Sequence, residues 1–95
     1  MPHVLMTRCE QKKEFRGAGG DYSKWVEVSA SEVAGVSRHR IRCMHCHGAV
    51  RLHQQQVDHG PQDHVEHRLR QDSEHCKGGV YYQGPPHRLS TQPVE

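Results

Sequence analysis

Cys43 and Cys46 form a C-x2-C pair in the segment CMHCHG. Two thiols at this spacing can supply half of a zinc site, attach a c-type haem when a histidine follows, or act as a redox pair. Gly48, just after the pair, is expected to ease the tight turn that brings both thiols to one point. Which chemistry applies depends on the other residues that the fold can bring to the two sulfurs.

A second group of ligand residues, at His64, His67 and Cys76, lies about one hairpin further along the chain. Zinc takes four ligands in a tetrahedron, and in proteins most of them are Cys thiolates and His imidazoles. A close pair of ligands, a hairpin-sized gap and a second cluster is the spacing of zinc fingers. The sequence therefore predicts one structural zinc ion.

The local structure of residues 64–76 decides which histidine binds. On a helix, His64 and His67 share one face and both could bind. On a strand they point to opposite faces, so one of them binds and Cys76 completes the set. On a strand Val65 shares a face with His67, so Val65 could pack in a small core while His67 reaches the metal. We predict the ligands Cys43, Cys46, His67 and Cys76, with His64 as the alternate ligand.

The competing chemistries lack their supporting context. Haem attachment needs export and an apolar pocket, but the first residues contain no apolar run after a basic start, so we expect no signal peptide. A thioredoxin-like pair needs a βαβ context, whereas the flanks here are typical of strands and turns. A catalytic zinc would keep one position open for water, with Glu66 as a general base. The chain offers more candidate ligands than a closed site takes, so we expect no enzyme activity.

The composition leaves little core to support the fold. Only 33% of the 95 residues are hydrophobic and 5% are aromatic, and a domain of this size buries a small share of its unfolded surface. Such chains rely on a metal, a disulfide or a partner. No segment approaches the roughly 20 apolar residues of a membrane span. We expect a cytoplasmic protein, where disulfides rarely persist and cysteines are more often metal ligands.

Short strands and turns must position the ligands. The residue patterns predict a strand at 25–28, one helical turn from Ser29 to Gly35, a strand at 39–43, alternation over 48–55, a turn at 57–63, and a strand or short helix at 64–76. We predict a small β-rich (α+β) zinc-stabilised domain over residues 22–83, with a zinc-ribbon-like hairpin and one further strand at 80–82. Residues 1–21 are expected to be weakly ordered, with a flexible joint at 17–22, and residues 84–95 to form a disordered tail.

The segments RCMHCHGAVRLH and HVEHRLRQDSEHC resemble a bacterial zinc-finger pattern, C-x2-C-x-G-x-V, then a hairpin, His-x2-His and a downstream cysteine. The pattern occurs in small uncharacterised bacterial proteins and at the front of competence-protein CoiA-like chains. The match covers about residues 38–79. Met44 stands where proline commonly follows the first cysteine, and Val65 where an aromatic residue is common. The resemblance implies a metal-binding module without catalysis, with matching positions at Cys43, Cys46, Gly48, Val50, His64, His67 and Cys76.

Arginines on the expected strands bear on the choice of partner. They could form a basic strip that binds phosphate backbones, made of Arg38, Arg40, Arg42, Arg51, Arg68 and Arg70. The net charge of +2 is mild, however. We predict a zinc-binding module that mediates nucleic-acid or protein interaction. The alternative is an accessory or scaffold protein with no nucleic-acid affinity.

Overall fold

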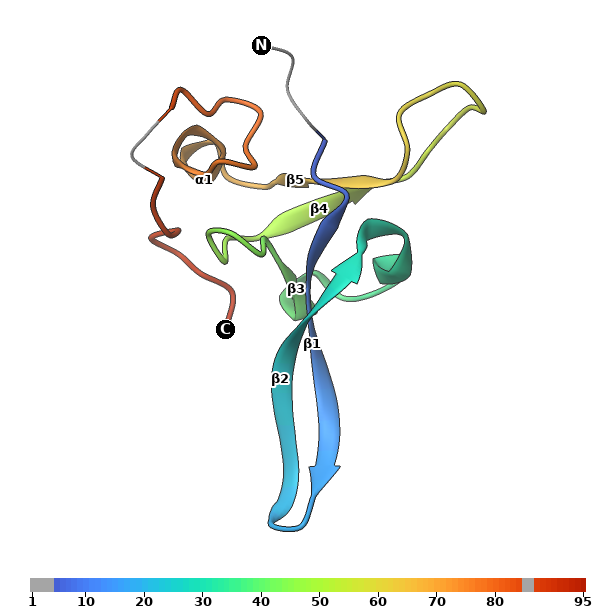
Figure 1. The fold of residues 1–95 in the computed structure, drawn as a ribbon, viewed down its shortest axis with the longest axis vertical. Coiled ribbons are helices and arrows are strands. Elements are labelled where there is room, and N and C mark those ends of the chain that lie inside the picture. Colours follow the sequence, from blue (N-terminus) through green and yellow to red (C-terminus); the bar gives the residue numbers. More distant parts are fainter. Residues whose placement is uncertain (1–4, 85–86) are drawn as a thin grey trace.

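The computed structural model describes residues 5–84 and 87–95, which form two small antiparallel sheets with short helical turns (Figure 1). The strands lie in the order β2-β1-β3 in one sheet and β4-β5 in the other. This architecture confirms the prediction of a small β-rich protein. The elements are β1 (Arg8–Gly17), β2 (Gly20–Ser29), η1 (Ala30–Val33), η2 (Arg38–Arg40), β3 (Ile41–Arg42), β4 (Val50–His53), β5 (His64–His67) and α1 (Arg70–His75).

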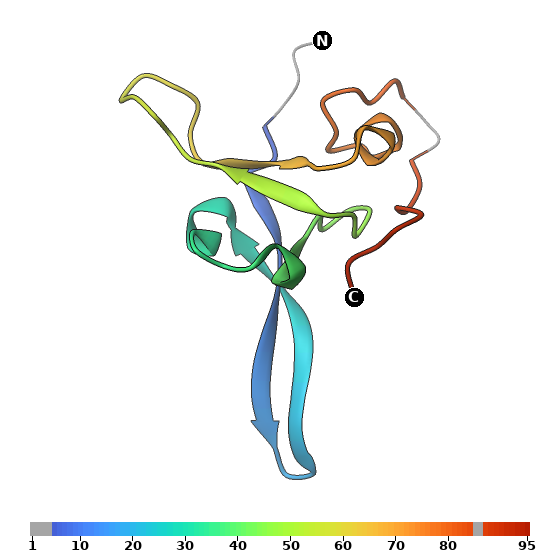
Figure 2. The same ribbon diagram turned by 180° about the vertical axis from the view of Figure 1, so that it is seen from behind.

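Strands β1 and β2 form a long hairpin whose outer half projects away from the rest of the molecule (Figures 1 and 2). The two strands pair over their full length, from Arg8 opposite Ser29 to Gly17 opposite Gly20. Gly20 has a φ of 117°, a conformation that only glycine adopts readily, so it closes the tight turn. The expected flexible joint at 17–22 is therefore the turn of this hairpin.

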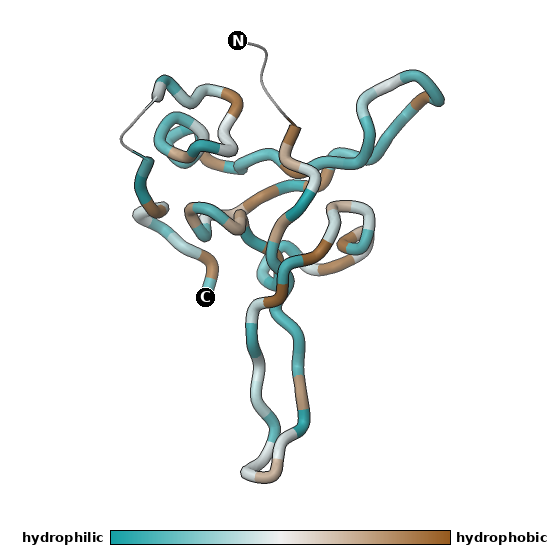
Figure 3. The backbone as a smooth tube through the Cα atoms, in the orientation of Figure 1, coloured by the Kyte–Doolittle hydropathy of each residue, from teal (hydrophilic) through white to brown (hydrophobic). Residues whose placement is uncertain are grey.

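Strand β1 corrects the expectation that residues 1–21 are weakly ordered. Residues 8–17 are a regular strand, while residues 1–4 lie outside the described part of the chain. Most residues of the hairpin's outer half are exposed, and Figure 3 shows that this part of the chain is largely hydrophilic. Backbone hydrogen bonds hold the two strands together, and these bonds do not require apolar residues to alternate along the sequence.

The start of the chain joins the two sheets. Val65 in β5 donates its backbone N–H to the carbonyl of Met6 at 2.8 Å, just before β1 begins. Strand β1 then pairs with β3, where Gln11 lies opposite Ile41. The expected strand at 39–43 is shorter than predicted, because residues 38–40 form a 3₁₀ turn that the Ser37 side chain caps by accepting from the His39 N–H.

The core lies where the two sheets meet, and cysteine is a large part of it. None of the aromatic residues in the described part of the chain belongs to this buried cluster. The core and the candidate metal ligands therefore occupy the same small volume. Its members are Met6, Cys9, Val28, Ala30, Val33, Ile41, Cys43, Cys46, Val50, Val65 and Cys76.

The remaining segments follow the predictions in part. Residues 64–76 contain both predicted alternatives, the strand β5 followed by the helix α1. The helical turn predicted after Ser29 is η1, and there the Glu32 side chain accepts a hydrogen bond from the Ser29 N–H at 2.8 Å. Residues 80–82 form turns and coil instead of the expected strand. No helix in residues 5–84 and 87–95 combines the length and the apolar character that a bilayer crossing requires.

The C-terminal segment returns to the middle of the molecule. Backbone N–H groups of Ser90 and Val94 donate to the carbonyls of Cys46 and His47, each at 2.8 Å. We expected residues 84–95 to form a disordered tail, but these bonds tie residues 87–95 to the C-x2-C turn. Residues 85–86 lie outside the described part of the chain. Polar composition alone could not reveal these bonds, because they join backbone groups.

Candidate metal centre

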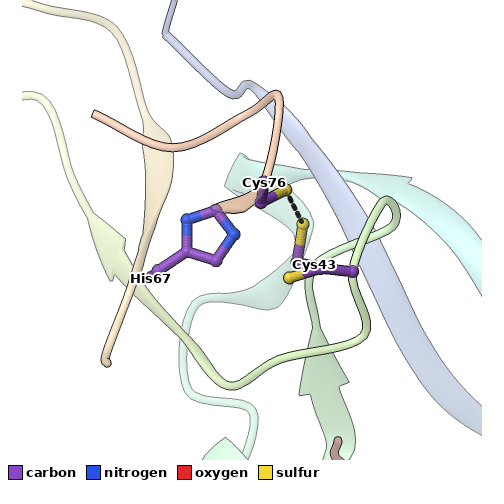
Figure 4. Close-up of side chains that lie close together, drawn as sticks. Cys43, His67 and Cys76 are labelled. Carbon is purple, nitrogen blue, oxygen red and sulfur yellow. Dashed lines mark hydrogen bonds between the residues drawn. The ribbon is translucent and has the colours of Figure 1, made fainter. Parts of the chain in front are cut away.

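Three separate segments bring the four predicted ligands together. Cys43 and Cys46 lie in the turn between β3 and β4, His67 ends β5, and Cys76 directly follows α1. The ligand atoms of the four residues all lie within 4.8 Å of one another. Figure 4 shows His67 and Cys76 facing Cys43 across this small space. The four residues are therefore positioned to bind a metal ion.

The sulfur–sulfur distance fits coordination by a common ion. Cys43 Sγ and Cys76 Sγ are 3.7 Å apart, and all four cysteines of the chain are free. A disulfide would require about 2.0 Å. Two thiolates bound tetrahedrally to one zinc ion, each at about 2.3 Å, lie about 3.8 Å apart. The observed distance therefore matches the edge of a tetrahedral thiolate site.

The imidazole of His67 is the second indication of a metal. Both of its ring nitrogens are buried and have no hydrogen-bond partner among the described residues. A buried polar atom left without a partner costs about 1–3 kcal/mol. Coordination of one nitrogen to an ion, beside the sulfurs of Cys43 and Cys76, would remove part of that cost. The donor set of three thiols and one imidazole fits zinc.

Backbone amides support each of the three sulfurs. In every case the N–H two residues after the cysteine donates to the cysteine sulfur at 3.3–3.4 Å. Hydrogen bonds of this kind favour the charged thiolate over the thiol, and they fix the direction in which the sulfur points. The three pairs are His45 with Cys43, Gly48 with Cys46, and Gly78 with Cys76.

The ionisation of the cluster follows from these contacts. Hydrogen bonds from the thiols of Cys46 and Cys76 hold the pKa of Cys43 well below its usual range, and the same pairing raises the pKa of Cys46. Burial lowers the pKa of His67, but the neighbouring sulfurs of Cys43 and Cys76 raise it more, to about 9. The cluster thus concentrates negative charge on sulfur, and this charge attracts a cation.

Cys9 is the fourth buried cysteine, and it does not belong to the group of four. Burial, followed by the negative charge of Cys43, raises the pKa of Cys9 to about 11. A thiol with so high a pKa is neutral at physiological pH. Cys9 therefore acts as a small apolar side chain of the core.

The tight turn of the C-x2-C pair has a different cause from the expected one. His47, with a φ of 66°, takes the left-handed conformation, and its N–H donates to the Cys43 carbonyl at 3.0 Å. Gly48 is needed for space, because a Cβ there would lie 2.3 Å from Asp72 Oδ2. The absence of a side chain at Gly48 thus lets α1 pack against the turn.

His64, the alternate ligand, is not in this group. It is on β5 three residues before His67, and alternation along the strand points the two side chains to opposite faces. Val65 shares the face of His67 and is buried in the core, as the strand argument requires. The ring of His64 instead contacts Glu66, at 3.1 Å between Nε2 and Oε2.

Residues His53, His64 and Glu66 form a second group of ligand atoms that lie within 4.8 Å of one another. Sequence reasoning considered His64 and Glu66 only for the first centre and missed His53. The signal that could have found the group is the register of the β4–β5 hairpin. His53 lies opposite His64, and Glu66 follows on the same face two residues later.

Comparison with known proteins gives a family without a described function. The model of an uncharacterised protein family matches residues 3–95. No curated protein and no solved structure matches the chain. Nothing in these comparisons links the chain to CoiA-like zinc-binding segments, so that resemblance stays a prediction.

Proposed function

Because the chain belongs to an uncharacterised protein family, we propose its function from the site itself: a small module that three buried cysteines and one half-buried histidine build around one structural zinc ion. The observation that supports it most is the closed donor set. Three cysteines that are 0% exposed and one histidine would fill the four positions of a tetrahedral zinc site, which would leave no place for a catalytic water. The β4–β5 hairpin supplies His67 and is the candidate for the zinc-ribbon-like hairpin that we propose.

Native mass spectrometry tests the metal. Protein purified without added metal and without a histidine tag is expected to carry one zinc ion per chain, held through dilution. The ion should be lost on acidification, because protons compete with zinc for thiolate and imidazole. A covalent haem adduct, or metal-free protein with a disulfide between Cys43 and Cys46, would contradict the zinc assignment.

Two arginines of the predicted basic strip, Arg40 in η2 and Arg42 in β3, are paired with carboxylates. Arg42 donates to Glu10 at 2.7 Å, and Arg40 lies 3.3 Å from a carboxylate oxygen of Glu14. Each of these guanidinium groups is thus paired within the protein. Pairing with carboxylates weakens the attraction of these two arginines for a phosphate backbone.

We infer that the outer half of the β1–β2 hairpin contacts single-stranded nucleic acid. Lys13 lies directly opposite Lys24, and like charges opposite each other on a hairpin are destabilising. The next pair on this face is Phe15 with Tyr22, stacked with ring centroids 5.6 Å apart. Lysines for phosphates beside aromatic rings for bases are the elements of a single-strand binding surface. A bound phosphate would also relieve the repulsion between the two lysines.

The double substitution Lys13→Gln and Lys24→Gln is expected to weaken retention on a single-stranded oligonucleotide. The slope of log K against log salt should fall by about 1.4, because each phosphate contact to a single strand contributes about 0.7. Lys12→Gln with Arg16→Gln removes the same charge from the opposite face of the hairpin and is the matched control. Binding that is independent of salt, or an equal loss in both double variants, would contradict this surface.

The alternative is an accessory or scaffold protein with no nucleic-acid affinity. The pairing of Arg40 and Arg42 with carboxylates favours it, since these arginines then serve the fold. Under this alternative, titrations with oligonucleotide stay flat at every salt concentration while the protein retains its zinc. The two candidates are therefore separated by one binding series on metal-loaded protein.

A further inference from the structure

The β4–β5 hairpin carries a second cluster of ligand groups on the face opposite His67. His53 and His64 are directly opposed in the register, and Glu66 follows on the same face. We propose that these three residues form a second metal site, distinct from the thiolate centre. It takes a divalent transition ion such as zinc and leaves coordination positions open. Two imidazoles and one carboxylate are a donor set of open zinc and iron sites.

The distances fit a shared ion. Glu66 Oε2 lies 3.1 Å from His64 Nε2 and 3.7 Å from His53 Nε2. Imidazole nitrogen and carboxylate oxygen bound tetrahedrally to zinc, each at about 2.0–2.2 Å, lie about 3.4 Å apart. The two observed distances lie on either side of this value. All three ligand atoms are within 4.8 Å of one another.

The hydrogen bond made by the His64 nitrogen that faces away from Glu66 determines which ring nitrogen can bind a metal. His64 Nδ1 lies 2.8 Å from the carbonyl oxygen of Gln62. A carbonyl only accepts, so Nδ1 carries the hydrogen and donates. In the neutral ring, Nε2 then presents a lone pair toward Glu66. An Nδ1–H bonded to a backbone carbonyl is the usual support of a metal-binding histidine.

An ion satisfies this cluster better than a proton does. A second proton on His64 would let Nε2 donate a hydrogen bond to Glu66, but it would provide no partner for His53. His53 Nε2 is buried and has no hydrogen-bond partner among the described residues. One cation placed among the three groups would accept lone pairs from all of them. The third group, His53, is therefore the observation that favours a metal.

One histidine ring must turn for the site to bind an ion, and the site opens into a pocket. The His53 and His64 rings stack with centroids 5.2 Å apart and planes at 11°, so one ring must turn to aim both lone pairs at one ion. The His53 side chain is 37% exposed and is the one free to turn. Both histidines also line a pocket of about 390 Å³ beside the loop that carries Val57 and Pro61. An ion and a small ligand could enter there.

A cobalt titration of the full chain, with zinc already bound at the thiolate centre, tests the second site. We expect one further equivalent of Co²⁺ to bind without a sulfur-to-cobalt charge-transfer band, because no thiolate contributes. His53→Gln and Glu66→Gln should each weaken this binding by more than about 100-fold, beyond the cost of losing a group that only hydrogen-bonds to a metal ligand. His39→Gln removes an exposed histidine on η2 and should bind as the parent does.

The outcomes separate the two sites. Uptake of no second ion, or equal loss of Co²⁺ affinity in His53→Gln and His39→Gln, would overturn the proposal. Folding of each variant is checked through the charge-transfer band of cobalt placed at the thiolate centre. Absence of that band in the parent would instead refute the proposed zinc module. Binding at the three nitrogen and oxygen ligands would still be measured by mass spectrometry.

Discussion

Removal of the metal is expected to unfold residues 38–79. The four proposed ligands connect the C-x2-C turn, the end of β5 and the end of α1, and the side chains of the three cysteines are part of the core. Zinc binding contributes about 10–16 kcal/mol to small zinc-finger peptides. That is as large as the total stability of a typical domain, about 5–15 kcal/mol. Without the ion, the remaining apolar side chains cannot hold these segments together.

Circular dichroism and amide NMR spectra before and after chelation measure this loss, with mass spectrometry to confirm complete metal removal. The expected result is collapse of amide dispersion for residues 38–79 and its recovery when zinc is returned. Secondary structure and dispersion that persist in verified metal-free protein would refute the structural role of the ion.

His67→Gln is expected to remove most of the zinc affinity of the thiolate centre, while His64→Gln leaves it nearly unchanged. The two histidines lie on the same strand, but only His67 belongs to the group with the three cysteines. Loss of a direct ligand should lower the affinity by more than the roughly 10–100-fold that follows loss of a group hydrogen-bonded to a ligand. Competition with a chromophoric zinc chelator measures both variants under identical conditions.

Cys76→Ser gives an independent check on the same set of ligands. It should lower zinc affinity at least as much as His67→Gln, since serine is a poor zinc ligand and Cys76 is fully buried. Equal affinities for His64→Gln and His67→Gln would mean that the ligand set is wrong. His64 is also assigned to the second site, so His64→Gln would lower total metal binding even with the thiolate centre intact. The charge-transfer band of cobalt bound to the thiolates reports the thiolate centre alone, and it is the signal to compare between His64→Gln and His67→Gln.

The grouping of the four residues at the thiolate centre could be predicted because the signals are mostly local. A C-x2-C pair makes its own turn, and the two-residue period of a strand places Val65 and His67 on one face. Burial of Val65 against the core then directs His67 to the cysteines. The turn of the C-x2-C pair and the alternation of the strand both follow from a few neighbouring residues.

Features that depend on distant partners could not be predicted. Strand β1 carries no apolar alternation on its outer half, since its stability there comes from pairing with β2. The space at Gly48 is occupied by Asp72 from α1, and the second ligand group depends on the register between β4 and β5. Each of these is a relation between segments, which composition and local pattern do not encode.

An ion bound by both Cys43 and Cys76 would be a cross-link between residues 33 positions apart. A permanent cross-link closing a loop of that size would reduce the entropy of the unfolded chain by an amount worth about 4 kcal/mol at 25 °C. An ion is a reversible cross-link, so near saturation each tenfold fall in free metal lowers stability by about 1.4 kcal/mol. Proteases degrade the unfolded form in proportion to its population. The lifetime of this chain in a cell would therefore follow the supply of metal.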